Sequence, residues 1–427
     1  MPVIEKLSAI EILDSRGKPT VKATCTLKGG ASASASVPSG ASTGSAEAHE
    51  LRDGEEKRYR GQGCRRAVAN VNGEIANALR GWDVADQAQL DQTLIALDGT
   101  PNKSRLGANA ILAASIAFAR AAAVERGLPL YEHFARMIGR APVTLPRLTI
   151  NLFSGGKHAG GQMPIQDILI VPLAVTIEQG LADAYAVYQA AAELTRQKYG
   201  MRALTADEGG LAPPFPSVEA ALEDAVEAIA GAGLSPVHDV GLALDVASSH
   251  FHTDGQYRFV GDALTPPQMI ERLMGWVRDF PMIVSIEDGL SEDDWEHWPQ
   301  WRRQRGLGDR LVLGDDLLCT NPARISRAIQ TGAANALLLK VNQIGTLTEA
   351  GDALGLARNA GWNVTVSARS GETEDDWLAD LAVGWAGDQI KVGSITQSER
   401  LAKYNRLLEI EAESELPVVS WPGRLDD

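Results

Sequence analysis

The second half of the chain alternates short apolar runs with longer segments of mixed polarity. The runs are three to seven residues long, and the segments between them are long enough to form helices. Short buried strands that alternate with helices are typical of βα units, in which the strands form a parallel sheet. The pattern therefore predicts an α/β fold with strands at residues 240–246, 282–286, 311–313, 336–339, 362–366 and 389–392.

Each predicted strand carries a charged residue at or near its carboxyl end, at intervals of 22 to 42 residues. In a (β/α)₈ barrel the carboxyl ends of the strands open onto one mouth, where the active sites of barrel enzymes lie. One charge after an apolar run would be an ordinary solvated loop, but six in register indicate a barrel enzyme. The six residues are Asp245, Glu287, Asp315, Lys340, Arg369 and Lys391.

The first part of the chain mixes strand and helix patterns and predicts a separate α+β domain. Residues 3–13 and 20–27 have strand patterns, and residues 105–126 have an alanine-rich helix pattern that Gly127 and Pro129 end. Two prolines and a glycine within residues 139–146 indicate a boundary. We therefore expect an α+β N-terminal domain at 1–138 and a barrel domain at 139–427.

Composition and charge narrow the class of protein. A formal net charge of −15 argues against nucleic-acid or anionic-membrane partners, because polyanion binding relies on an excess of Lys and Arg. Cys25, Cys64 and Cys319 have neither metal-ligand spacing nor the spacing of a disulfide framework. The N-terminus has no signal-peptide pattern, and the longest apolar stretch, residues 110–119, is too short to span a bilayer. We expect a cytoplasmic globular protein.

Asp245, Glu287 and Asp315 place three carboxylates on adjacent predicted strands. Carboxylate oxygens suit a hard divalent cation such as Mg²⁺, and the alternative is a set of helix caps and surface salt bridges. Asp288 and Asp316 add further acids beside them. Because unpaired acids buried at a barrel mouth would be costly, the pattern favours a metal site.

Lys340 lies in a run that is too apolar for a surface strand. It is either neutralised by a carboxylate within the core or tuned into a general base by burial and neighbouring cations. Arg369 and Lys391 follow on the next two predicted strands. Together with Mg²⁺ they would bind a small, highly anionic substrate and would depress the pKa of Lys340, as general-base chemistry requires.

Three loops supply further candidate groups. Residues 38–44 form a small-residue loop that could fold over a phosphate, although a plain flexible turn is the simpler explanation. The glycine-rich segment 155–161 contains His158, and Glu208 precedes two glycines. Glu208 could be an acid that faces Lys340, but its spacing alone does not assign that role.

Nine separated motifs, in the same order as in the family, give the chain a specific resemblance to enolase (phosphopyruvate hydratase) over residues 4 to 412. The motifs are residues 11–21, 39–44, 50–54, 102–110, 207–210, 286–288 with 292–295, 314–317, 369–374 and 398–405. The resemblance implies an α+β N-terminal domain that caps a modified (β/α)₈ TIM barrel, in a homodimer or an octamer. It also implies dehydration of 2-phosphoglycerate to phosphoenolpyruvate with two Mg²⁺ ions per active site.

The resemblance further implies a role for each matching side chain. The catalytic group would comprise Lys340 as the base, Glu208 as the acid, His158 and Asp167. The metal ligands would be Asp245, Glu287 and Asp315 for the first Mg²⁺ and Ser39, with its loop, for the second. The substrate-binding residues would be Gln166, Arg369, Ser370 and Lys391.

Several positions depart from the family pattern near the proton donor and the pocket wall. The departures are Ala368 for histidine, Asp167 for glutamate, Ser154 for asparagine, Gln397 for arginine, an added cation at Lys157, and the C-terminal residues 421–427. Removing an imidazole from the pocket wall would cost catalysis about 1–3 kcal/mol. The positions expected to bind metal and to remove the proton match the family.

These departures leave several functions open. The preferred one is an enolase-type hydro-lyase that acts on 2-phosphoglycerate or on a close analogue. The space at Ala368 and the cation at Lys157 motivate a larger group on phosphorus, as in a paralogue resembling carboxyphosphonoenolpyruvate synthase in phosphonate or phosphinate biosynthesis. The alternatives are a non-catalytic enolase-fold binding protein and a superfamily racemase or cycloisomerase. The intact Glu208 and Lys340 argue against the former, and loop 39–44 argues against the latter.

Overall fold

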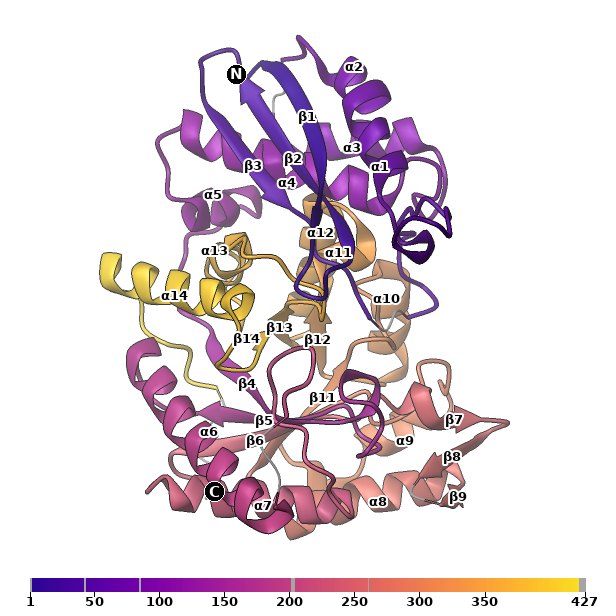
Figure 1. Cartoon of the computed structure of the whole chain (residues 1–427), viewed down its shortest axis with the longest axis vertical. Coiled ribbons are helices and arrows are strands. Elements are labelled where there is room, and N and C mark those ends of the chain that lie inside the picture. The colour runs from indigo at the N-terminus through magenta and orange to yellow at the C-terminus, as the bar shows by residue number, and fades with distance from the viewer. Residues whose placement is uncertain (1, 42–43, 84–85, 201–203, 260, 422–427) are drawn as a thin grey trace.

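The computed structural model describes residues 2–41, 44–83, 86–200, 204–259 and 261–421. Figure 1 shows an N-terminal domain of strands and helices at one end of the molecule and a strand barrel below it. Residues 42–43 of the small-residue loop and 422–427 of the C-terminal segment lie outside the described residues.

An antiparallel three-stranded sheet and a set of helices form the N-terminal domain, as the sequence predicts. The predicted helix begins at Ala108 rather than at residue 105, because Gly107 has a φ of 97° that ends the helical conformation there. The strands are β1 (Ile4–Leu13), β2 (Pro19–Leu27) and β3 (Ser32–Ser36), and the helices are α1 (Arg65–Asn70), α2 (Ala76–Leu79), α3 (Gln87–Asp98), α4 (Ala108–Glu125) and α5 (Leu130–Met137).

Helix α4 is the central helix of this domain. It packs against β2 and β3 on one side and contacts helices of the barrel domain on another. Within the described part of the chain it is the one helix long and apolar enough to cross a membrane, and 83% of it is buried in the protein. The apolar stretch is longer than the ten residues expected, because alanines extend it at both ends, and its burial marks it as a core helix.

Eight strands close into a barrel in the order β10-β11-β12-β13-β14-β4-β5-β6, which confirms the predicted barrel fold. The six strands predicted from apolar runs are present to within one residue at each end, whereas β4 and β5 were not predicted. The strands are β4 (Arg147–Ser154), β5 (Asp167–Pro172), β6 (Val240–Asp245), β10 (Ile283–Glu287), β11 (Leu311–Gly314), β12 (Ala336–Leu339), β13 (Asn363–Ser367) and β14 (Gln389–Gly393).

Helices surround the barrel, and a small three-stranded antiparallel sheet, which contains the hairpin strands given below, projects from one side of it (Figure 1). The helices are α6 (Ile177–Tyr199), α7 (Val218–Gly231), α8 (Pro266–Asp279), α9 (Trp298–Arg302), α10 (Pro322–Thr331), α11 (Val341–Ile344), α12 (Leu347–Asn359), α13 (Trp377–Gly384) and α14 (Ser398–Glu413). The hairpin strands are β7 (His252–Thr253), β8 (Gln256–Phe259) and β9 (Asp262–Leu264).

Strand β5 runs antiparallel to both of its neighbours, so the expectation of an all-parallel sheet is wrong for this strand. A parallel connection needs a crossover segment, usually a helix, whereas the segment between β4 and β5 contains only a short 3₁₀ turn in a glycine-rich loop. The reversal places the first residue of β5, Asp167, opposite Ser154 at the end of β4 and Asp245 at the end of β6. The amino-terminal end of β5 therefore lies at the mouth that the carboxyl-terminal ends of the other barrel strands form.

Direct contacts hold the N-terminal domain against the mouth of the barrel. Ser39 and Gly371 exchange two backbone hydrogen bonds, of 2.8 and 2.9 Å. Lys103 Nζ donates to Glu349 Oε1 at 2.9 Å, again across the domain junction. The predicted domain boundary at residues 138 and 139 lies in the connection between α5 and β4.

Candidate active site

The six charged residues predicted from the strand pattern meet at one mouth of the barrel. Five lie at or just beyond the carboxyl ends of β6, β10, β11, β12 and β13, and Lys391 lies within β14, two residues before its carboxyl end; the five are Asp245, Glu287, Asp315, Lys340 and Arg369. Eight of the predicted site residues line one small cavity of about 20 Å³: His158, Gln166, Glu208, Asp245, Lys340, Arg369, Ser370 and Lys391.

Lys391 connects two of the predicted metal-binding carboxylates. Its Nζ donates to Asp245 Oδ2 at 2.8 Å and to Glu287 Oε2 at 2.7 Å, and all three side chains are buried. Burial and the neighbouring charge of Asp245 raise the pKa of Glu287 well above its usual value. Its other oxygen, Oε1, is buried with no hydrogen-bond partner in the structure. The carboxylates of Asp245 and Glu287 therefore have fewer hydrogen-bond donors and less neighbouring positive charge than would pair all of their oxygens.

Lys340 pairs with the third predicted carboxylate. Its Nζ lies 2.5 Å from Asp315 Oδ2. The pKa of Lys340 is raised in this arrangement: burial lowers it most, but the surrounding carboxylates, Asp315 first and then Glu287, outweigh burial. The expected depression of this pKa is for a site with bound Mg²⁺, and it stays a prediction. Arg369 and Lys391 act in the expected direction and lower the pKa. The proton affinity of Lys340 therefore depends on what else binds Asp315.

The donor set fits a divalent cation. Asp245, Glu287 and Asp315 offer only carboxylate oxygens, which Mg²⁺ prefers, and the orphaned Glu287 Oε1 lacks a positive partner. Lys391 bridges Asp245 and Glu287, however, and Lys340 pairs with Asp315 alone. The compact acidic group at the mouth is Asp288, Asp315 and Asp316, whose ligand atoms lie within 4.8 Å of one another. Asp288 accepts the backbone N–H groups of Asp315 and Asp316 at 2.9 and 2.7 Å. Asp288 thus fixes the position of Asp315.

A chain of hydrogen bonds runs along the opposite, reversed-strand side of the mouth. Ser154 Oγ donates to Asp167 Oδ1 at 2.5 Å, and Asp167 Oδ2 lies 3.1 Å from His158 Nδ1. His158 Nε2 lies 3.7 Å from Glu208 Oε1, and Asn151 Nδ2 donates to Glu208 Oε2 at 3.0 Å. Ser154 and Asp167 are each shorter than the residue that the family pattern has at that position. Their side chains contact each other, and this contact pairs one buried carboxylate oxygen of Asp167.

His158 carries the positive charge in this chain of hydrogen bonds. Burial lowers the pKa of His158, but the carboxylates of Glu208 and Asp167 outweigh it and raise the pKa to about 9. Burial raises the pKa of Glu208, but His158 and Arg400 outweigh it and hold the pKa below its usual value. The stable arrangement is an imidazolium between two carboxylates, with the proton on the histidine.

Side chains that could bind an anion come from the segment after β13. Arg400, which is fully buried, donates to the carbonyl oxygens of Arg369 and Ser370 at 2.7 and 2.6 Å and fixes this segment. Ser370 Oγ accepts a hydrogen bond from Arg16 at 3.1 Å. Gln166 Nε2 donates to Asp245 Oδ2 at 2.9 Å. The structure thus places all four predicted substrate-binding residues, these three and Lys391, around one cavity.

Ser39 lies apart from the metal-binding carboxylates. Its hydroxyl donates to Glu50 Oε2 at 3.0 Å and accepts from Arg52 at 2.8 Å, both within the N-terminal domain. Its backbone pairs with Gly371, next to Ser370. The predicted role of Ser39 in binding a second metal therefore stays a prediction.

Ala368 and Lys157, two of the departures from the family pattern, differ in their position relative to the cavity. Ala368 is buried and lines the cavity between Ser367 and Arg369, so the missing imidazole does concern the pocket wall. Lys157 is exposed and is not among the residues that line the cavity. The use of Lys157 as an added cation of the pocket is not supported by this geometry.

Three residues at the site were not singled out from the sequence pattern: Glu47, Asn151 and Gln343. Glu47 forms an ion pair with Arg369, Asn151 binds Glu208, and Gln343 Nε2 donates to Asp315 Oδ1 at 2.8 Å. Glu47 and Arg369 are 322 positions apart, so no local spacing links them. Asn151 lies on β4, one of the two barrel strands that the sequence pattern did not predict.

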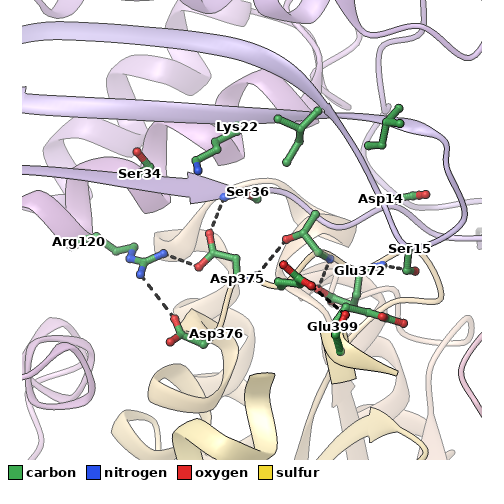
Figure 2. Close-up of a pocket in the computed structure, with 15 residues that line it drawn as sticks. Asp14, Ser15, Lys22, Ser34, Ser36, Arg120, Glu372, Asp375, Asp376 and Glu399 are labelled. Atoms are coloured by element: carbon green, nitrogen blue, oxygen red, sulfur yellow. Dashed lines mark hydrogen bonds and ion pairs between the residues drawn. The ribbon is translucent and has the colours of Figure 1, made fainter. Parts of the chain in front are cut away.

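A larger cavity of about 670 Å³ lies outside this mouth, at the junction of the two domains. Figure 2 shows Arg120 reaching across it to Asp375 and Asp376, while Asp375 also accepts the backbone N–H of Ser36 at 2.8 Å. The strand-end charges of the barrel do not line it. Size alone would therefore locate the candidate site wrongly.

Comparison with known families agrees with this geometry. Residues 4–134 match the family described as enolase, N-terminal domain. Residues 142–420 match the family described as enolase, C-terminal TIM barrel domain. Together the two matches cover most of the chain, from the first strand to beyond the last barrel helix. The chain therefore belongs to the enolase family.

Proposed function

We propose that this chain is a Mg²⁺-dependent hydro-lyase that removes water from 2-phosphoglycerate to give phosphoenolpyruvate. The observation that carries the proposal is that Lys340 and Glu208, a candidate base and a candidate acid, line one cavity together with the cations Arg369 and Lys391. An α-proton next to a carboxylate is weakly acidic because its removal adds charge to an anion. A site rich in fixed positive charge offsets that cost.

Asp245, Glu287 and Asp315 would hold one Mg²⁺, and Ser39 with its loop a second. When bound, the metal would supply positive charge that stabilises the extra negative charge of the deprotonated substrate. A cation on Asp315 would also offset the effect of that carboxylate on Lys340, and Arg369 and Lys391 would then keep the pKa of the base low.

In the first step Lys340 Nζ takes the α-proton. In the second step the bond from carbon 3 to its hydroxyl breaks, and the hydroxyl leaves as water with a proton from Glu208. Because Glu208 is held ionised by its neighbours, we propose that His158, 3.7 Å away, supplies the proton that Glu208 passes on. Arg369 and Ser370 bind the phosphoryl group, and Lys391 and Gln166 orient the carboxylate.

The test is steady-state formation of phosphoenolpyruvate from 2-phosphoglycerate with Mg²⁺. We expect turnover in the ordinary enzyme range of about 1–10³ s⁻¹ for the wild-type chain. A rate equal to that of Lys340→Ala would overturn the proposal for this substrate. Mg²⁺-dependent binding of 2-phosphoglycerate without turnover would point to a modified substrate.

A second candidate function has one observation in its favour. Ala368 lines the cavity next to Arg369 and Ser370, where a phosphoryl group would lie, and its methyl group takes up less of that space than the imidazole of the family pattern would. Such a substrate would fit a paralogue in phosphonate or phosphinate biosynthesis that makes carboxyphosphonoenolpyruvate. If so, Ala368→His would reduce kcat/KM for the enlarged analogue by about 10–200-fold while sparing 2-phosphoglycerate. An equal effect on both substrates would remove this candidate.

We further propose that the protein works in the cytoplasm as a homodimer or an octamer. The three cysteines are free and buried, which suits a reducing compartment. Sedimentation or light-scattering mass in solution tests the oligomeric state, and a monomer at micromolar concentration would contradict it.

A further inference from the structure

Arg369 is held by a carboxylate from the other domain. Its NH1 donates to Glu47 Oε2 at 3.0 Å and its NH2 donates to Glu47 Oε1 at 3.1 Å. Both side chains are buried, with exposed fractions of 3% for Arg369 and 8% for Glu47. Paired contacts between the two terminal nitrogens and the two carboxylate oxygens fix the plane of the guanidinium as well as its position.

Glu47 is itself held by the residues around it. Its Oε1 accepts the backbone N–H of Gly44 at 3.0 Å and a hydrogen bond from Gln343 Nε2 at 3.4 Å. Gln343 also donates to Asp315, one of the carboxylates that would bind metal. Asn342, one residue earlier, accepts from Arg369 NH1 at 3.0 Å. The contacts of Glu47 thus extend from the N-terminal loop to the barrel mouth.

Other carboxylates would attract Arg369 if Glu47 lost its charge. After Glu47, the nearby charges of Asp315 and Asp316 also raise the pKa of the Arg369 guanidinium. A buried cation needs a counter-charge, and a long flexible side chain will turn toward the nearest one. An arginine paired with Asp315 would be displaced from the position for binding an anion and would occupy a metal carboxylate.

We propose that Glu47 is a positioning residue, which orients Arg369 for the anionic group of the substrate and keeps it away from the carboxylates Asp315 and Asp316. The proposal rests on the proposed function, because it takes Arg369 as the ligand of the phosphoryl group. It means that the anion site of the barrel is completed by the N-terminal domain.

The experiment is calorimetric titration of inorganic phosphate into the full-length chain in the presence of Mg²⁺. Glu47→Gln keeps the shape of the side chain but removes its charge, and we expect the Kd for phosphate to rise at least about tenfold. Glu47→Asp keeps the charge and should recover most of the lost affinity. The matched control is Glu349→Gln, which breaks the ion pair with Lys103 across the same domain junction and should leave phosphate binding unchanged.

Several results would overturn the proposal. They are phosphate binding by Glu47→Gln that is within twofold of wild type or tighter, an equal loss in Glu349→Gln, no recovery in Glu47→Asp, and no phosphate binding by the wild-type chain. Binding is measured without turnover, so a wild-type chain that binds phosphate but does not dehydrate 2-phosphoglycerate would refute the proposed function alone. In an active enzyme, Glu47→Gln should raise KM more than it lowers kcat.

Discussion

The two sides of the barrel mouth handle buried charge in different ways. On the side of β6, β10 and β11, ammonium groups contact carboxylates directly, and Glu287 Oε1 still lacks a partner. On the side of β4 and β5, the carboxylate of Asp167 is satisfied on both oxygens, by Ser154 and His158. On the first side a buried carboxylate oxygen therefore lacks a partner, whereas on the second side both oxygens of Asp167 are paired, and the buried atoms without a partner are amide oxygens such as Asn151 Oδ1.

This difference bears on the departures from the family pattern. Carboxylates that are to bind an external cation would tolerate little change, and the carboxylates there match the pattern. A site completed by its own hydrogen bonds can change when two partners change together, as Ser154 and Asp167 do. The comparison therefore separates a side with an unpaired buried carboxylate oxygen from a side on which the carboxylate of Asp167 is paired, and the following variants test that separation.

Lys340→Ala should have the largest effect. Loss of the general base should lower kcat/KM for 2-phosphoglycerate by about 10²–10⁴-fold. Because Asp315 loses its ammonium partner, Mg²⁺ affinity should be kept or increased. Steady-state kinetics and Mg²⁺ titration measure the two effects. A parallel loss of Mg²⁺ binding would mean that Lys340 acts by holding the metal site together.

Glu287→Gln should abolish most of the stabilisation by Mg²⁺. Ligand that binds only the folded state stabilises it by about 2.7 kcal/mol at a hundredfold excess over Kd. The wild-type unfolding temperature should therefore rise with added Mg²⁺, and that of Glu287→Gln should rise much less. Glu349→Gln, away from the mouth, serves as the control. An equal rise in all three proteins would contradict a metal site at Glu287.

Asp167→Asn should shift the titration of His158 and leave Mg²⁺ binding in place. The folded-state pKa of His158, about 9, lies above the ordinary value near 6.5, so its contribution to stability is complete below about 6.5 and is lost as pH rises through about 9. Without the Asp167 charge the pKa falls, and the loss occurs at lower pH. NMR titration of His158 and unfolding at several pH values measure this. An unchanged pKa would show that Glu208 alone holds the proton.

Lys157→Ala should have the smallest effect. Lys157 is exposed and does not line the cavity, so we expect kcat and KM to stay within about twofold of wild type. Kinetics with 2-phosphoglycerate and with an analogue enlarged at phosphorus check this. A selective loss with the analogue would return Lys157 to the substrate site.

The sequence by itself determined the positions of six barrel strands and the charges at their ends. Short apolar runs predict buried strands, and the charge at the end of a run is next to it in the sequence. Both features can therefore be identified without knowing which other parts of the chain they contact. The loop patterns singled out His158 and Glu208, and the family resemblance gave these two residues their roles and added Gln166, Asp167, Ser370 and Ser39. All of these except Ser39 lie at the mouth or contact its charged residues.

The tertiary structure alone decided the direction of β5 and the pairing of the charges. The sequence pattern did not identify β4 and β5 as strands. Only the closed barrel shows that Asp167 reaches the mouth from the amino-terminal end of its strand. The pairing of Glu47 with Arg369 likewise joins two domains across most of the chain. The physical reason is that local patterns determine burial and secondary structure, whereas the choice of partner depends on which groups the packed domains bring within hydrogen-bond distance.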